Sequence, residues 1–187
     1  MPLNLPNLLT WLRIALIPLV IGVFYLPAGW MSATEANLLA TAIFVVAAVT
    51  DWLDGYLARR LNQLSAFGAF LDPVADKLMV AAALIMLVDL DRTHSVIALI
   101  IIGREIAISA LREWMAKAGK SGSVAVSFIG KLKTTFQMIA ISLLLYWEPL
   151  AGIPVQLLGH LLINLAALLT LVSMFYYLRM AAKTLRE

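Results

Sequence analysis

The sequence contains no cysteine and little charge. Without cysteine, disulfide bonds, thiolate metal sites and cysteine nucleophiles are all excluded. Charged residues make up 13% of the 187 residues, about half their share in soluble domains, whereas hydrophobic residues make up 63% and the mean hydropathy is +0.93. The N-terminal segment lacks the basic region and cleavage site of a signal peptide, so none is expected. This composition excludes an ordinary soluble domain and predicts a protein built from membrane helices.

Six apolar runs are long enough to cross a bilayer, which takes about 20 residues of helix. They lie at about 8–27, 35–53, 70–88, 95–116, 128–147 and 155–178. Turn-forming residues separate them, and no stretch remains for a soluble domain. The sequence therefore predicts one all-α domain over residues 1–187, an integral membrane protein with six transmembrane helices.

Basic residues fall almost entirely on one side of this arrangement. The three hairpins on the other side contain one basic residue, Arg92, which leaves 13 of the 14 lysines and arginines on the side that holds both termini. Cytoplasmic loops are enriched in lysine and arginine. We therefore expect both termini, and a polar active site at the same ends of the helices, to face the cytoplasm.

Four aspartates interrupt the apolar pattern where the second and third spans meet the cytoplasmic side. Asp51 and Asp54 are three residues apart and Asp72 and Asp76 are four apart, so each pair lies on one helical face. Like charges at a membrane edge must be solvated, protonated, paired or bound to cations. Pairing with Arg59 or other nearby basic residues is the alternative to a functional site.

Metal binding explains the four carboxylates most simply. Carboxylate oxygens are hard ligands that suit Mg²⁺ or Mn²⁺, and four carboxylates balance two divalent ions. Two such ions form a clamp that is used for displacement at phosphorus. Gly55, Ala58 and Gly68 lie beside the acids and leave room for a bulky ligand close to the backbone.

The same residues form a recognisable pattern, D-x2-D-G-x2-A-R-x8-G-x3-D-x3-D. It resembles the signature of the CDP-alcohol phosphotransferase family at all eight fixed positions, which are Asp51, Asp54, Gly55, Ala58, Arg59, Gly68, Asp72 and Asp76. Residues 4–13, 104–114 and 130–138 resemble the bacterial branch of that family that uses glycerol 3-phosphate as its acceptor. The resemblance therefore extends over most of the chain.

This resemblance implies an activity and a location. It implies a homodimeric enzyme of the bacterial inner membrane that transfers the phosphatidyl group of CDP-diacylglycerol to sn-glycerol 3-phosphate and releases CMP. It also implies that two Mg²⁺ or Mn²⁺ ions are bound, with Asp51, Asp54 and Asp72 as ligands. Asp76 matches the acid that touches metal and also takes the proton of the acceptor hydroxyl.

The nucleotide site has further candidates. Gly55, Ala58 and Gly68 match positions where the CDP moiety lies close to the backbone. Arg59 could contact the nucleotide phosphates or pair with Asp54. Asn7 and Thr10 could line the nucleotide site or cap the start of the first span.

A phosphorylated acceptor needs cations that the acids do not neutralise. The candidates lie near the cytoplasmic ends of the third to fifth spans and are Lys77, Arg104, Arg112, Lys131 and Lys133. The alternative is that they anchor the helices by reaching lipid headgroups.

Two other functions stay open at this point, namely another acceptor such as inositol phosphate or serine, and divalent-cation transport. We expect membrane lipids around the chain and no nucleic-acid partner.

Overall fold

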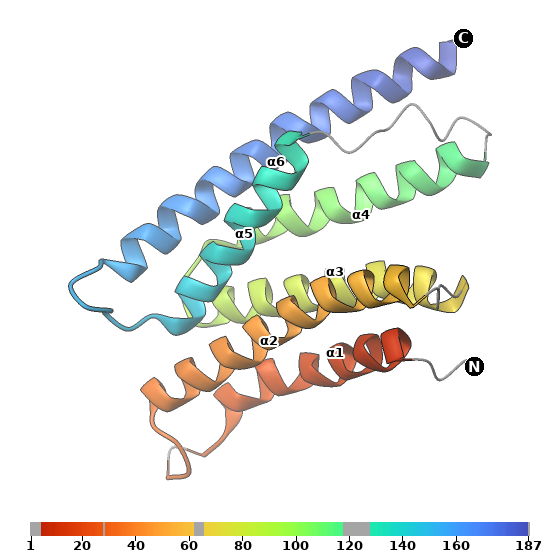
Figure 1. The fold of residues 1–187 in the computed structure, drawn as a ribbon. Helices are drawn as coiled ribbons and strands as arrows, with labels where there is room; N and C mark the ends of the chain where they lie inside the picture. The colour runs from red at the N-terminus through yellow and green to blue at the C-terminus, as the bar shows by residue number, and fades with distance from the viewer. Residues whose placement is uncertain (1–4, 28, 62–65, 118–127, 187) are drawn as a thin grey trace.

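The computed structural model describes residues 5–27, 29–61, 66–117 and 128–186, without the side chains of residues 5–6, 52, 55, 58–59, 66, 69, 128–131 and 183–186. These residues form helices and no β-strand (Figure 1). The elements are α1 (Leu5–Gly22), η1 (Val23–Tyr25), α2 (Ala33–Arg60), α3 (Ala66–Asp89), α4 (Ser95–Lys117), α5 (Phe128–Tyr146) and α6 (Val155–Arg186). The all-α prediction is confirmed, and each predicted span overlaps one α-helix, with ends that differ by at most eight residues.

Three stretches within the described residues are long and apolar enough to cross a membrane. They are Asn7–Tyr25, Ala33–Asp51 and Val155–Ala182. In α3 and α4 charged residues interrupt the apolar run, among them Asp72, Asp76 and Arg104. The chain thus has membrane-spanning character, while the crossing of all six helices stays a prediction.

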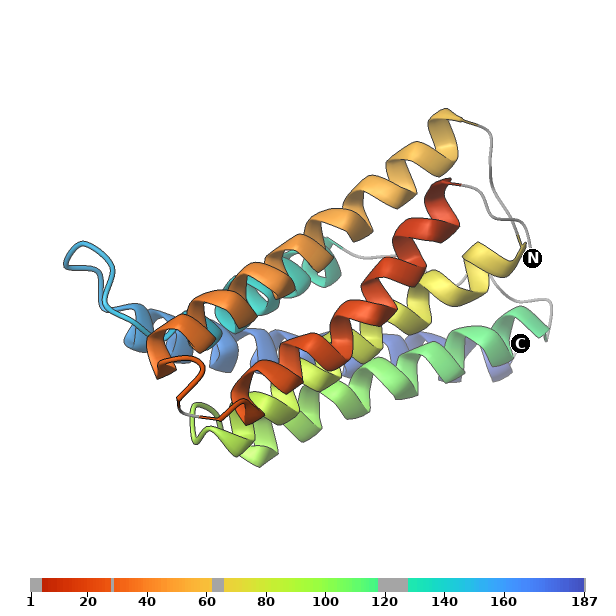
Figure 2. The same cartoon turned by 90° about the horizontal axis from the view of Figure 1, so that it is seen from below.

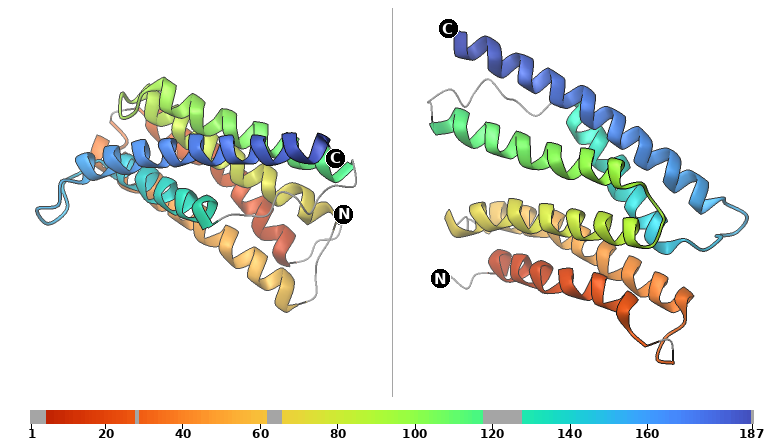
Figure 3. Two further views of the ribbon diagram at one scale, coloured as in Figure 1. Left: turned by 90° about the horizontal axis from the view of Figure 1, so that it is seen from above. Right: turned by 180° about the vertical axis from the view of Figure 1, so that it is seen from behind.

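The helices form two groups that pack side by side. Helices α1, α2 and α3 contact one another, α6 packs on α4 and α5, and contacts of α2 with α5 and of α3 with α4 join the groups. The start of α1 and the end of α6 lie at the same end of the bundle (Figures 1 and 3). The end of α2 lies there too (Figure 2). The acids at the end of α2 therefore lie at the end of the bundle that holds the termini.

Small residues allow the helices to approach closely. The buried core contains alanines at helix contacts, Ala47, Ala83, Ala98, Ala140 and Ala167, among larger apolar side chains. Small residues at interfaces are the usual means of close packing between membrane helices. At Gly159 of α6 an added Cβ would come within 2.8 Å of a Leu144 side-chain carbon, so a larger residue would force the Leu144 side chain to shift.

A buried arginine joins the helices at the opposite end of the bundle. Arg92, in the connection between α3 and α4, donates from Nη1 to the carbonyls of Leu144 (3.0 Å) and Leu145 (2.9 Å) near the end of α5. Its Nη2 donates to Oδ1 of Asn37 on α2 (2.7 Å), and Asn37 donates to Glu148 (3.1 Å). The last carbonyls of a helix have no partner within the helix, so Arg92 satisfies two of them. We call this arrangement the Arg92 clasp.

Candidate active site

The first turns of α1 present a polar face to α2 and α3. Asn7, Thr10 and Arg13 recur at three-residue spacing and are all buried. Helix α1 starts at Leu5, two residues before Asn7. Asn7 therefore lies inside the helix, and the interpretation of Asn7 as a helix cap is wrong.

Two residues of α1 hold the acids of the neighbouring helices. The Arg13 guanidinium forms ion pairs with Asp51, at 2.5 Å, and with Asp54 on α2. The Thr10 hydroxyl donates to Oδ1 of Asp72 on α3 at 2.5 Å. Asp54 is buried, whereas the Asp51 side chain is 44% exposed. Helix α1 thus brings the aspartates of two other helices to one place.

Asp76 completes this group from α3. Its carboxylate is half-buried and lies within electrostatic range of Asp51, Arg13 and Glu105, and Asp51 lies within such range of Asp72. The structure therefore brings together the four predicted carboxylates, which we call the acid cluster: Asp51, Asp54, Asp72 and Asp76. In the ion pairs that the structure describes, one guanidinium, that of Arg13, is shared by two of these four carboxylates.

A second charged group lies between α4, α5 and α6. Arg104 donates to Glu105 and, from Nη2, to Oγ of Ser173 on α6, both at 3.1 Å. Lys133 of α5 forms an ion pair with the same Glu105 carboxylate. Arg104 and Lys133 are buried at 7% and 1% exposure, which disfavours the alternative that they reach for headgroups.

The other predicted phosphate ligands differ in their placement. Arg112 is exposed, and its guanidinium lies 5.5 Å from the centre of the Tyr177 ring. Lys77 donates to the carbonyl of Pro73 in its own helix at 3.0 Å. The side chain of Lys131 lies outside the described residues. We call Arg104, Arg112 and Lys133, with Glu105, the cation cluster.

The sequence of this chain matches the family described as CDP-alcohol phosphatidyltransferase over residues 3–179. The chain belongs to this family. Relatives named CDP-diacylglycerol–glycerol-3-phosphate 3-phosphatidyltransferase are 52% identical. Those from Shigella flexneri serotype 5b and Escherichia coli K12 align over all of both chains. The relative from Salmonella choleraesuis aligns over 97% of this chain and 96% of its own.

The acid cluster of this CDP-alcohol phosphatidyltransferase has the ligand type for divalent ions, but its carboxylates are not arranged around an ion. Its donor set of four carboxylates fits hard divalent ions. Among the described residues, no three acidic or histidine side chains converge closely enough to hold an ion. Arg13 occupies Asp51 and Asp54 instead. Divalent ions would therefore compete with Arg13 for these two carboxylates.

The structure describes only some of the residues that are predicted to bind the nucleotide. Helix α3 starts at Ala66, so Gly68 and Asp72 lie one turn apart on one helix, and Gly68 is buried. Thr10 is held by Asp72 and lies beside them. The side chains at Gly55, Ala58 and Arg59 lie outside the described residues, although their positions belong to α2.

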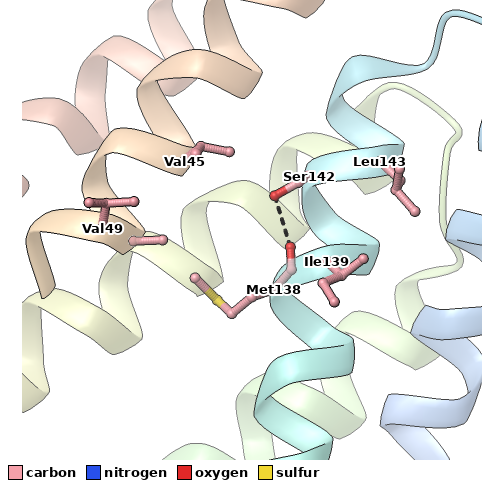
Figure 4. A pocket seen from close by; sticks show the side chains of 7 residues that line it. Val45, Val49, Met138, Ile139, Ser142 and Leu143 are labelled. Carbon is pink, nitrogen blue, oxygen red and sulfur yellow. Dashed lines mark hydrogen bonds between the residues drawn. The ribbon is translucent and has the colours of Figure 1, made fainter. Parts of the chain in front are cut away.

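An apolar groove lies between α2 and α5 (Figure 4). It has a volume of about 390 Å³ and is lined by Val45, Ala48, Val49, Met138, Ile139, Ser142 and Leu143. The Ser142 hydroxyl donates to the carbonyl of Met138 (2.9 Å), so it offers the groove no free donor. Val49 precedes Asp51 by two residues, but Asp51 leaves another face of α2 and pairs with Arg13 of α1.

Sequence reasoning missed the contribution of α6. Thr170, Ser173 and Tyr177 are almost completely buried and recur at positions i, i+3 and i+7, on one face of the helix. Gln137 of α5 is buried as well. Polar residues at helical spacing within an apolar span were the available signal, since buried polar groups in a membrane mark functional positions.

Proposed function

We propose that this chain transfers the phosphatidyl group of CDP-diacylglycerol to sn-glycerol 3-phosphate, giving phosphatidylglycerophosphate and CMP. The observation that supports it best is the position of the acid cluster next to the cation cluster, with Asp76 within electrostatic range of Glu105. The first suits a metal-bound diphosphate and the second a phosphorylated acceptor. The names of the 52% identical relatives specify the same two substrates.

The donor is proposed to bind at the acid cluster. Asp51, Asp54, Asp72 and Asp76 would hold two Mg²⁺ or Mn²⁺ ions, which when bound supply charge neutralisation at the diphosphate and a better leaving group. The nucleotide would lie against the residues Asn7, Thr10, Gly55, Ala58, Arg59 and Gly68. The apolar groove of α2 and α5 offers a place for an acyl chain.

The acceptor is proposed to bind through its phosphate. The cations assigned to it are Lys77, Arg104, Arg112, Lys131 and Lys133. In the reaction the acceptor hydroxyl attacks the β-phosphorus, a new P–O bond forms, and the bond to CMP breaks. Asp76 is assigned to take the hydroxyl proton, because it lies within electrostatic range of Glu105 of the cation cluster.

The site is proposed to face the cytoplasm of a bacterium from the inner membrane. All six helices would cross the bilayer, with both termini cytoplasmic. The start of α1 and the end of α6 lie at one end of the bundle (Figure 1), and so does the end of α2 (Figure 2). This arrangement supports the topology, as does the lysine and arginine bias of the sequence. We also propose that the enzyme acts as a homodimer.

A single assay tests the proposed function. Purified protein in mixed micelles receives CDP-diacylglycerol and one alcohol from a panel of glycerol 3-phosphate, glycerol, serine and inositol phosphate, with and without Mg²⁺. CMP release is expected with glycerol 3-phosphate, and only when Mg²⁺ is present. Faster release with inositol phosphate or serine would assign a different acceptor, and release without divalent ions would overturn the metal assignment.

A further inference from the structure

One tyrosine of α6 lies among the cations assigned to the acceptor phosphate. The guanidinium groups of Arg104 and Arg112 each lie 5.5 Å from the centre of the Tyr177 ring. This distance is within the range of a cation–π interaction, in which a cation is attracted to the ring quadrupole. The tyrosine itself is 1% exposed, so its ring is fixed by the packing around it.

The surroundings of Tyr177 connect it to the rest of the cation cluster. Its hydroxyl lies within electrostatic range of the Lys133 ammonium group. One turn earlier on α6, Ser173 accepts a hydrogen bond from Arg104 and donates to the carbonyl of Thr170 (2.9 Å). Helix α6 therefore holds Arg104 at two points and Arg112 at one.

The cation cluster has a net positive charge that a bound phosphate would balance. Three cations and the Glu105 carboxylate leave two net positive charges, and Glu105 already accepts from both Arg104 and Lys133. A phosphate monoester carries about −1.5 to −2 charges at neutral pH. In the part of the chain that the structure describes, buried Nε of Arg104 has no hydrogen-bond partner. A donor that is buried and unpaired costs free energy unless a ligand satisfies it.

We propose that Tyr177 is a positioning residue for the acceptor: its ring holds Arg104 and Arg112 in the orientation in which they bind the phosphate of glycerol 3-phosphate. This inference rests on the proposed function and adds α6 to its acceptor site. Arginine is long and flexible, so an aromatic surface that orients two guanidiniums before binding lowers the entropic cost of binding. The ring, and not the hydroxyl, is the part of Tyr177 that the two arginines contact.

Three substitutions separate this role from simple packing. Tyr177→Leu removes the aromatic face, and Tyr177→Phe keeps the face and removes the hydroxyl. Phe175→Leu also removes an aromatic face, but at an exposed position of α6. Initial rates of CMP release are measured while each substrate is varied in turn. Tyr177→Leu is expected to raise the KM for glycerol 3-phosphate by about tenfold, as two cation–π contacts are lost. The KM for CDP-diacylglycerol should stay within about twofold in all three variants.

A second series avoids any dependence on folding of the leucine variant. Phenylalanines with increasing numbers of fluorine atoms are placed at position 177, which weakens the ring quadrupole while the shape is nearly kept. The KM for glycerol 3-phosphate should rise stepwise along the series. A flat series, a phenylalanine variant as impaired as Tyr177→Leu, or equal rises in both KM values would overturn the role of the ring. Failure of the wild-type protein to use glycerol 3-phosphate would instead overturn the proposed function.

Discussion

The two ends of the helix bundle use charge in opposite ways. At one end the single guanidinium of Arg92 is matched by two carbonyls and the Asn37 amide oxygen, and it also lies 4.8 Å from the centre of the Trp147 ring. At the other end Arg13 pairs with Asp51 and Asp54, and Asp72 and Asp76 of α3 lie within electrostatic range of Asp51. The charge of Arg92 has its hydrogen-bond partners within the fold. The carboxylates that are proposed to serve a ligand outnumber the one guanidinium with which the described ion pairs join them.

This difference has an energetic consequence. A buried charge with complete partners costs little to keep, and removal of such a group leaves its partners unsatisfied. Like charges held close together destabilise the folded state until a ligand of opposite charge binds. Neutralising variants should therefore reduce stability at the Arg92 end and reduce turnover at the acid end.

The largest effect is expected from loss of one acid. Asp72→Asn should lower CMP turnover by about three orders of magnitude or more, because a metal clamp contributes several kcal/mol to the reaction. The asparagine oxygen can still accept from Thr10, so the protein should fold. The matched control is Asp91→Asn at the opposite end, where φ is 55°, a value that asparagine tolerates. Near-normal turnover of Asp72→Asn at ordinary Mg²⁺ would break the comparison.

The next effect concerns the small residues beside the acids. Ala58→Leu should weaken CMP binding by roughly 100-fold, as the added atoms fill space assigned to the nucleotide. Calorimetric titration of the purified protein with CMP and Mg²⁺ measures this change. Ala42→Leu, at an exposed position of the same helix, is the control and should bind CMP as the parent does. Unchanged affinity of Ala58→Leu would mean that Ala58 serves helix packing.

A moderate effect is expected at the cation cluster. Arg112→Gln should raise the KM for glycerol 3-phosphate by about tenfold, the value of one charge-assisted hydrogen bond, with little change in the KM for CDP-diacylglycerol. Lys117→Gln neutralises an exposed cation on the same helix that pairs with Glu113, and it should leave both constants unchanged. Equal effects of Arg112→Gln on both substrates would return Arg112 to the role of a membrane anchor.

The smallest effect on turnover is expected at the Arg92 clasp. Arg92→Gln should lower the free energy of unfolding by about 3 kcal/mol, because three hydrogen bonds from a buried guanidinium are lost. Thermal unfolding in detergent measures this, with His94→Gln in the same connection as the control. Turnover of the folded variant at low temperature should match the parent. A large loss of turnover without loss of stability would show that the two ends are not separate in function.

The sequence predicted what depends on local pattern. Apolar runs placed all six helices, and the spacing of Asp51, Asp54, Asp72 and Asp76 predicted two acidic faces that the structure brings together. The extension of α2 to Arg60, seven residues beyond the predicted span, was missed because charged residues after Asp51 ended the apolar pattern. Helix boundaries in a bundle of this kind depend on packing as well as on hydropathy.

Contacts between distant segments could not be predicted in the same way. Arg13 and Asp54 are 41 residues apart, and Arg92 and Leu144 are 52 apart. In the sequence Arg92 is only a basic residue in a hairpin. Likewise, Tyr177 joins the cation cluster only because α6 packs on α4 and α5. Which helices are neighbours decides these roles, and periodicity within one helix does not contain that information.

The most direct test of the account is the stabilisation of the protein by Mg²⁺ in the absence of substrates. A ligand that binds the folded state raises the midpoint of thermal unfolding. We expect that midpoint to rise with Mg²⁺ in the parent protein and in Asp91→Asn, and to respond much less in Asp76→Asn. Without Mg²⁺, Asp76→Asn should be at least as stable as the parent, since one like charge is removed from the acid cluster. Equal Mg²⁺ responses in all three proteins, or a less stable Asp76→Asn without Mg²⁺, would contradict the account.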